Sequence, residues 1–166
     1  MLSLVGLGAV LWRKPIAAWL ATVAALAITF SYTIAPAMNP ERSGSAFMHD
    51  VQARVESGEL LGLVAYKEQF LLYLDRPTVN FGHRRWREGP VEGYDASAWL
   101  GAAPNRVLLV PESSLKPCFD QSTDRQLAGN SAGDDWYLVR GAADAGCVSK
   151  GNAGRAISYD PRPGGT

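Results

Sequence analysis

Residues 16–35, IAAWLATVAALAITFSYTIA, are an uncharged stretch of 20 residues. At 1.5 Å per residue, a helix of this length reaches about 30 Å, the thickness of the hydrocarbon core of a membrane. The stretch therefore predicts a membrane-spanning helix. It divides the chain into a membrane segment at 1–38, a domain at 39–160 and a short polar tail at 161–166, which we expect to be disordered.

A second apolar run, MLSLVGLGAVLW at 1–12, precedes this stretch and is separated from it by Arg13, Lys14 and Pro15. Twelve helical residues cover about 18 Å, which is too short to cross a membrane. We interpret the run as part of a helix. A polytopic membrane protein whose coding sequence begins partway through a helix would show this pattern. We therefore expect the chain to be the last part of a larger membrane protein.

Arg13 and Lys14 are the only charged residues before Glu41. The positive-inside rule places a short basic loop in the cytoplasm, so we expect the chain after about residue 36 to lie outside it. The alternative is a cleaved signal peptide, because Ala35, Pro36 and Ala37 resemble a small-residue cleavage site. The length of the apolar stretch and the run at 1–12 argue against cleavage.

The charge of the predicted outer domain is close to neutral. All 16 acidic residues and 14 of the 16 basic residues follow residue 38. A nucleic-acid partner would require a basic footprint, which this balance argues against. His49 and His83 are the only histidines, and no His or Cys pair has the spacing of metal ligands, so we expect no metal site.

Cys118 and Cys147 are the only cysteines. An even number of cysteines in an oxidising compartment permits a disulfide, which we expect here if the domain lies outside the cytoplasm. The alternative is two unrelated buried thiols, because nothing in the local sequence fixes the geometry of a bond.

The domain alternates between helical and strand-like patterns, which predicts a layered α/β fold with about five strands. Helical spacing of apolar residues occurs at 43–58, 67–75 and 94–103, and apolar runs of strand length occur at 60–66, 78–82, 106–111, 136–140 and 155–159. Residues 120–135 are polar and glycine-rich, and we expect a loop there.

Two groups of polar residues are candidates for ligand contacts. Lys67 and Glu68 directly follow the first predicted strand, where α/β folds place ligand-binding groups, although they are equally suited to begin a helix. Arg84, Arg85 and Arg87 surround a tryptophan and would suit a lipid phosphate or an anionic lipid-linked donor. The alternative for this second group is a solvated loop.

Gly129-Asn130-Ser131-Ala132-Gly133 matches the G-x-S-x-G motif of a hydrolase nucleophile elbow. That motif requires a strand before it, a helix after it and a histidine later in the chain. Both histidines of this chain lie upstream of the motif, so we expect a glycine-rich surface loop.

The run LGLVAYKEQFLLYLDRPTVNFG at 61–82 follows Leu60 and is followed downstream by RVLLVP and WYLVR. This pattern resembles the C-terminal soluble domain of bacterial lipid-linked sugar transferases. These belong to the family of dolichyl-phosphate-mannose–protein mannosyltransferase and aminoarabinose lipid A transferase. The resemblance covers the last span and nearly all of the outer domain.

The resemblance implies a polytopic GT-C enzyme of the bacterial inner membrane, with this domain in the periplasm and no cofactor. Such enzymes move a sugar from a polyprenyl-phosphate carrier to a lipid, glycan or protein acceptor. The expected partners are therefore membrane lipids and a polyprenyl-phosphate-linked sugar.

The family places its catalytic acidic residues in the first outer loops, which have no counterpart in this sequence. Glu68, Asp75 and Asp95 do not fall at matching positions, so no residue here inherits a catalytic role. We expect the chain to be inactive alone. The alternative is a single-span anchored domain that binds or interacts in the periplasm without catalysis.

Alkaline phosphatase fused after Thr166 tests the predicted topology, because this reporter folds into an active enzyme only in an oxidising compartment. We expect an active fusion in a bacterial host. A cytoplasmic reporter at the same position is the matched control and is expected to be inactive. The reverse pattern of activities would overturn the topology.

Overall fold

The computed structural model describes residues 15–35, 44–82, 90–120 and 124–161. The chain divides into two compact units, Met1–Pro40 and Glu41–Thr166. The expected partial helix at 1–12 lies outside the described residues, and so does the expected tail beyond Pro161.

The described part of the first unit is a single apolar helix. It comprises α2 (Pro15–Thr29) and a π-helical continuation, η1 (Phe30–Ile34), and none of the side chains in these two elements is buried. Together they are 20 residues long and apolar enough to span a membrane. The Thr22 and Thr33 hydroxyls donate to the carbonyls of Ala18 and Thr29, so both polar groups are satisfied within the helix, as a lipid environment requires.

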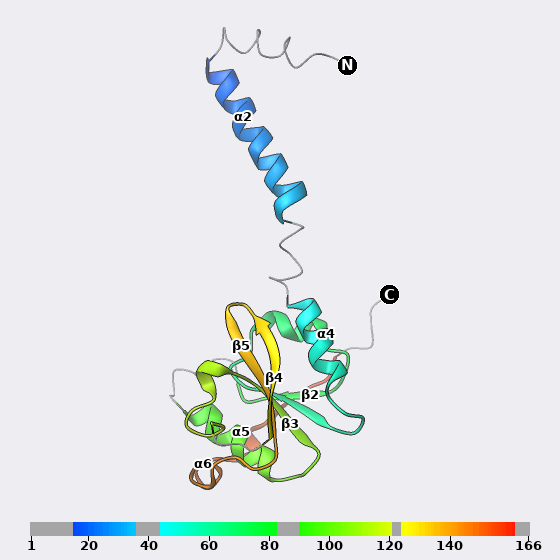
Figure 1. Cartoon of the computed structure of the whole chain (residues 1–166), viewed down its shortest axis with the longest axis vertical. Coiled ribbons are helices and arrows are strands. Elements are labelled where there is room, and N and C mark those ends of the chain that lie inside the picture. Colours follow the sequence, from blue (N-terminus) through cyan, green and yellow to red (C-terminus); the bar gives the residue numbers. More distant parts are fainter. Residues whose placement is uncertain (1–14, 36–43, 83–89, 121–123, 162–166) are drawn as a thin grey trace. The chain divides into compact units, whose positions relative to one another are not determined.

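The second unit is built on a six-stranded mixed sheet with the order β4-β5-β3-β1-β2-β6. Figure 1 labels β2, β3, β4 and β5 of this sheet, together with the helices α4, α5 and α6. The strands are β1 (Leu60–Leu63), β2 (Thr78–Asn80), β3 (Arg106–Pro111), β4 (Asp124–Ser131), β5 (Asp134–Arg140) and β6 (Ile157–Tyr159). The helical elements are α4 (Ser45–Ala53), η2 (Glu68–Tyr73), α5 (Val91–Gly101), η4 (Glu112–Ser114), α6 (Ala145–Lys150) and η5 (Ala153–Arg155). The expected α/β class is confirmed.

The centre of the sheet is parallel, and its flanks are antiparallel. β1 pairs in parallel with β2 on one side and with β3 on the other. β5 then pairs antiparallel with β3, and β6 pairs antiparallel with β2. The connection from β1 to β2 carries η2, and the connection from β2 to β3 carries α5, so the two crossovers run in opposite directions along the sheet.

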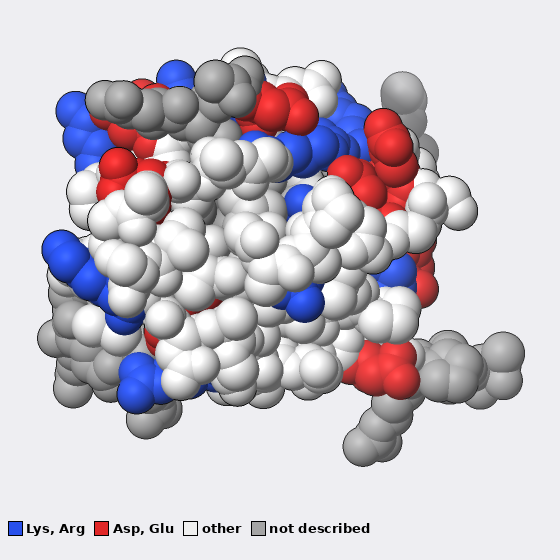
Figure 2. All heavy atoms as spheres, turned by 90° about the horizontal axis from the view of Figure 1, so that it is seen from below, with Lys and Arg blue, Asp and Glu red and all other residues white. Residues whose placement is uncertain are grey.

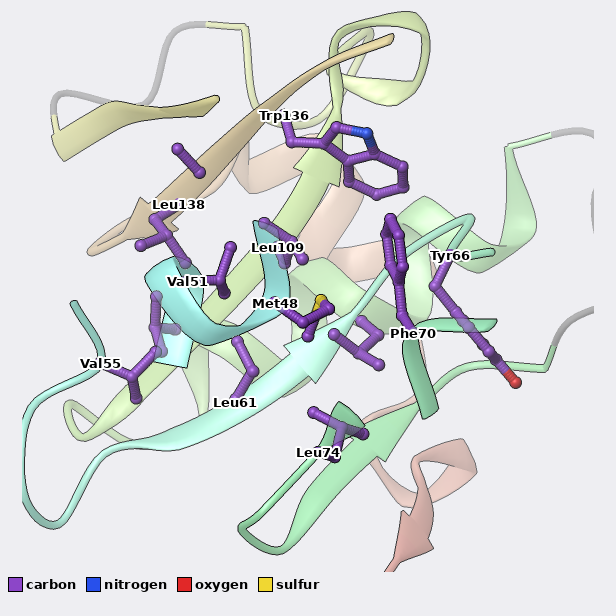
Figure 3. Close-up of a cluster of buried hydrophobic side chains, with 13 residues drawn as sticks. Met48, Val51, Val55, Leu61, Tyr66, Phe70, Leu74, Leu109, Trp136 and Leu138 are labelled. Carbon is purple, nitrogen blue, oxygen red and sulfur yellow. The ribbon is translucent and has the colours of Figure 1, made fainter. Parts of the chain in front are cut away.

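The central strands are buried on both faces, and their side chains alternate between two apolar cores. Leu61 and Leu63 of β1 face a core that includes residues of α4 and η2, among them Met48, Val51 and Phe70 (Figure 3). Side chains of α5, such as Trp99 and Leu100, belong to the other core, with Leu108 and Val110 of β3. Because the side chains of β3 enter an apolar core on either face of the sheet, RVLLVP is apolar at every central position.

Gly62 allows α5 to approach β1 closely. A Cβ atom at this position would lie 2.6 Å from Leu108 Cδ2 and 2.9 Å from Trp99 Cζ3. The Trp99 ring has little freedom to move, because it is 3% exposed and makes an edge contact with the Phe81 ring at 5.7 Å. The absent side chain at residue 62 is therefore part of the packing between helix and sheet.

The expected loop at 120–135 is wrong, because residues 124–131 form β4, which gives the sheet a sixth strand. β4 pairs with β5 through a two-residue turn, in which Ala132 (φ 54°) and Gly133 (φ 84°) both have positive φ. Both angles have the sign that a type I′ hairpin requires. Only Ala128 and Ser131 of β4 are buried, so the strand shows no apolar alternation.

Two expected helices differ in extent or kind, and one observed helix was not expected. The segment expected as a helix at 67–75 contains a 3-10 helix at Glu68–Tyr73, which begins after Lys67 in an extended conformation. α5 begins at Val91, three residues before the expected start at Tyr94. α6 was not expected from the sequence, and its start is capped by Asp144, whose side chain accepts a hydrogen bond from the Cys147 amide.

Replacing Gly62 with alanine is expected to lower the free energy of unfolding by about 1–3 kcal/mol, because buried Leu108 and Trp99 must shift. Urea denaturation followed by tryptophan fluorescence measures the change. Gly101→Ala in α5 is the matched control, because its new Cβ meets only Val148 Cγ2 at 4.0 Å. Equal effects of the two substitutions would contradict this account of the packing.

Candidate functional site

A crevice of about 300 Å³ opens at the carboxyl ends of β1 and β3. The strand order reverses here, because the chain leaves β1 toward β2 on one side and β3 lies on the other. Ligands of open α/β sheets bind at such a point, and the volume is at the lower end of the range of small-molecule sites. The described wall contains Val64, Ala65, Pro90, Glu92, Gly93, Ser113, Ser114, Lys116 and Pro117.

Glu92 is the buried polar group of this crevice. It lies in the first turn of α5, where a carboxylate interacts favourably with the helix dipole, and the residue is 6% exposed. Its Oε1 atom accepts a hydrogen bond of 2.7 Å from the Ala65 amide. The carboxylate thus joins the start of α5 to the end of β1.

Ala65 has an unusual backbone conformation. Its φ is 48°, in the left-handed region, which costs a residue with a Cβ about 1–2 kcal/mol. The hydrogen bond from its amide to Glu92 compensates part of this cost. Backbone strain of this kind is concentrated at ligand sites, and here it occurs in the wall of the crevice.

The opposite wall follows β3 directly. Ser113 and Ser114 belong to η4, and Lys116 precedes Pro117 through a cis peptide bond. The wall is anchored from below by Leu115 and Phe119, which are buried in the core beneath α5. The Ser113, Ser114 and Lys116 side chains supply hydroxyl groups and one ammonium group to the crevice.

A disulfide between Cys118 and Cys147 ties this wall to α6, with the two Cα atoms 5.6 Å apart. The Asp144 amide also donates a hydrogen bond of 3.0 Å to the Cys118 carbonyl. In the chain-entropy account, a link between residues 29 apart in sequence stabilises the fold by about 3–4 kcal/mol.

Tyr66 follows Ala65 and is buried in the core on the α4 side of the sheet (Figure 3). Burial raises the pKa of its phenol above the ordinary value, and the nearby negative charges of Glu68 and Glu92 raise this pKa further. Tyr66 is therefore a neutral phenol at physiological pH.

Lys67 and Glu68, the first predicted ligand contacts, do not line the crevice. They lie with Gln69 and Leu72 at a wide, open depression, and Lys67 Nζ is 3.4 Å from Asp134 Oδ2 at the β4–β5 turn. The chain carries these residues away because η2 covers the opposite face of the sheet through Phe70.

Arg84, Arg85 and Arg87, the second predicted group, lie outside the described residues. The G-x-S-x-G match at 129–133 spans the end of β4 and the turn into β5, instead of a turn from a strand into a helix. A nucleophile elbow is therefore absent at this position.

The four polar residues in the described wall of the crevice were not predicted from the sequence: Glu92, Ser113, Ser114 and Lys116. The sequence contained a signal for Ser113, Ser114 and Lys116, because they follow the predicted strand at 106–111, just as Lys67 follows the predicted strand at 60–66. Glu92 had no comparable signal, since its role depends on the start of α5 meeting the end of β1.

Charged side chains and metal-ligating side chains do not indicate a further site among the described residues. Figure 2 shows one face on which basic and acidic side chains lie mainly toward the margins and uncharged residues fill most of the middle. Within residues 15–35, 44–82, 90–120 and 124–161, no group of three His, Cys, Asp or Glu side chains is placed to hold a metal ion.

Comparison of the chain with protein-family models, with curated proteins and with solved structures found no match.

The disulfide is expected to form when the chain is produced in an oxidising compartment. Mass spectrometry of unreduced peptides should find Cys118 cross-linked to Cys147, with neither thiol alkylated before reduction. The Cys118→Ser/Cys147→Ser variant should lose about 3–4 kcal/mol of stability. Two freely alkylated thiols in the native protein would rule out the bond.

Proposed function

We propose that this chain is the last membrane span and the periplasmic domain of a membrane glycosyltransferase. The enzyme moves a sugar from a polyprenyl-phosphate carrier to a lipid, glycan or protein acceptor, and this domain contributes binding instead of catalysis. The observation that carries the binding role is the crevice at the reversal of strand order. The sugar-transfer chemistry rests on the resemblance of residues 61–82.

Two features support a location outside the cytoplasm. One helix of membrane length precedes the domain in sequence, with Arg13 and Lys14 before it. The domain also carries a disulfide, which is typical of proteins in oxidising compartments.

The two buried acidic residues of the described chain, Asp95 and Glu92, support a binding role over a catalytic one. Asp95 is 1% exposed, its Oδ1 atom accepts a hydrogen bond of 2.7 Å from the Asn152 amide, and its Oδ2 atom is 3.7 Å from Arg155. It thereby fixes the segment that leads to β6. Glu92 holds the Ala65 amide. Each of these carboxylates has a structural partner that a general base would have to leave.

A single-span anchored binding domain without catalysis is the second candidate. It is favoured by the compactness of the second unit, which has two apolar cores and antiparallel strands on both flanks of its parallel centre. An antibody against residues 45–160 separates the two candidates on an immunoblot of native membranes. The transferase proposal predicts a polypeptide much larger than 17.9 kDa, and a band at that mass would favour the second candidate.

The 166-residue chain alone is expected to transfer no sugar, because sugar transfer needs a positioned base and charge stabilisation at the leaving phosphate. Membranes that contain the chain are supplied with labelled polyprenyl-phosphate sugars and with lipid and peptide acceptors. Turnover that disappears in Glu68→Gln would show that the chain has its own catalytic site and would overturn the proposal.

A further inference from the structure

We propose that the outer surface of η2, formed by Lys67, Glu68, Gln69 and Leu72, contacts the lipid bilayer and inserts the Leu72 side chain at the boundary between headgroups and acyl chains. This inference rests on the membrane span of the proposed function, but it does not depend on sugar transfer. Three observations carry it: the exposure of Leu72, the fixed backbone of η2 and the place where the chain enters the second unit.

Leu72 is the most exposed large apolar residue that the structure describes in the second unit. It is 78% exposed, whereas Ile157 and Leu127 are 53% and 52% exposed. Side chains three residues apart in a 3-10 helix lie on the same side, so Phe70 and Tyr73 share the side that packs on the core and Leu72 is left outside. Single exposed apolar side chains are common on soluble proteins, so the exposure of Leu72 gains meaning from its setting.

Hydrogen bonds from two other elements hold η2 in place, so Leu72 is presented on a fixed backbone. The Tyr159 hydroxyl of β6 donates a hydrogen bond of 3.1 Å to the Leu71 carbonyl. The Gln52 side-chain amide of α4 donates a hydrogen bond of 2.9 Å to the Tyr73 carbonyl. The exposure of Leu72 is therefore built into the fold, and inserting this side chain into lipid requires little ordering of the backbone.

The chain enters the second unit directly beside η2. Gly44 precedes α4, and a Cβ atom at this position would lie 2.8 Å from Phe70 Cε1 of η2. Residues 36–43 separate Gly44 from Ala35, the last described residue of the apolar segment. The nine residue steps from Ala35 to Gly44 cover about 30 Å when fully extended. Covalent connection alone therefore keeps the entry point beside η2 within about 30 Å of the end of the predicted span.

This short connection makes one leucine sufficient for a contact. Burying a single leucine stabilises a contact only modestly, so a free domain would bind lipid weakly. A domain tethered this close to a bilayer has an effective concentration on the order of millimolar at the bilayer surface, which favours a weak contact. The bilayer is the occupant that the chain itself brings close, because the apolar helix precedes the domain in the sequence. Lys67 suits the same place, since a lysine stem lies along apolar surface while its ammonium stays among polar groups.

Methyl nuclear magnetic resonance of the full chain in phosphatidylcholine nanodiscs tests the inference. A fraction of the lipid carries a nitroxide on its acyl chain near the headgroup, which broadens the signals of nearby methyl groups. Leu20 and Leu26 of α2 report whether the apolar helix is in the bilayer. Leu127 is the matched control, because it pairs with Tyr137 on the face of the sheet opposite η2. We expect strong broadening at Leu72 as well as at the two α2 leucines, and little at the control.

Two variants assign the contact to Leu72. Leu72→Gln replaces the apolar side chain with a polar one of similar length and should lower the ratio of lipid-bound to free domain about tenfold. The loss is measured as weaker broadening of the methyl groups of the neighbouring Leu71. Leu127→Gln is the matched control and should leave this broadening unchanged. Both substituted side chains are exposed, so we expect both variants to fold.

Equal broadening of Leu72 and Leu127, or unchanged broadening of Leu71 in Leu72→Gln, would overturn the inference and leave the span intact. Absent broadening at Leu20 and Leu26 would overturn the span as well. Leu72 signals that shift only when two chains share a nanodisc, without broadening by the nitroxide lipid, would assign the surface to a second copy of the chain and would also overturn the inference. None of these outcomes depends on sugar transfer or on the size of the native polypeptide, so failure of the lipid contact is distinguishable from failure of the proposed function.

Discussion

The parallel pairing of β1 with strands on both of its sides is the constraint on which the rest of the second unit depends. Parallel neighbours cannot be joined by a tight turn, so the chain must cross over a face of the sheet twice, once in each direction. The two crossovers carry η2 and α5, whose apolar residues belong to different cores. β1 is consequently buried on both faces, and Gly62 leaves the space that the Trp99 ring occupies.

The same topology creates the crevice and determines what surrounds it. The chain leaves the end of β1 toward β2 and leaves the end of β3 toward β4 on the opposite side, so the two connections move apart and the gap between the ends of β1 and β3 stays open. The side toward β1 is held by the hydrogen bond between the Ala65 amide and Glu92, and the side toward β3 is held by the disulfide at Cys118. The site is thus attached to rigid elements on both sides, which limits the conformational entropy that ligand binding would cost.

The sequence was informative where burial is two-sided and uninformative where pairing alone stabilises an element. RVLLVP was recognised because every central residue of β3 is buried. β4 was missed because most of its side chains are exposed and its stability comes from backbone pairing with β5. For the site, residues that follow a strand were recognised at Lys67 but not at Lys116. Which of the two reaches the crevice depends on the direction in which the chain turns at Ala65, and its left-handed φ has no local signature in an alanine.

The carboxylate at the start of α5 maintains the left-handed turn at the end of β1, as a comparison of magnitudes shows. A φ in the left-handed region costs Ala65 about 1–2 kcal/mol. The hydrogen bond from the Ala65 amide to the Glu92 carboxylate has a charged acceptor and contributes about 1.5–3 kcal/mol. The position of Glu92 in the first turn of α5 adds about 0.3–1 kcal/mol through the helix dipole. These gains are comparable with the cost, so the wall of the crevice keeps its conformation through a contact between residues 27 apart in the sequence.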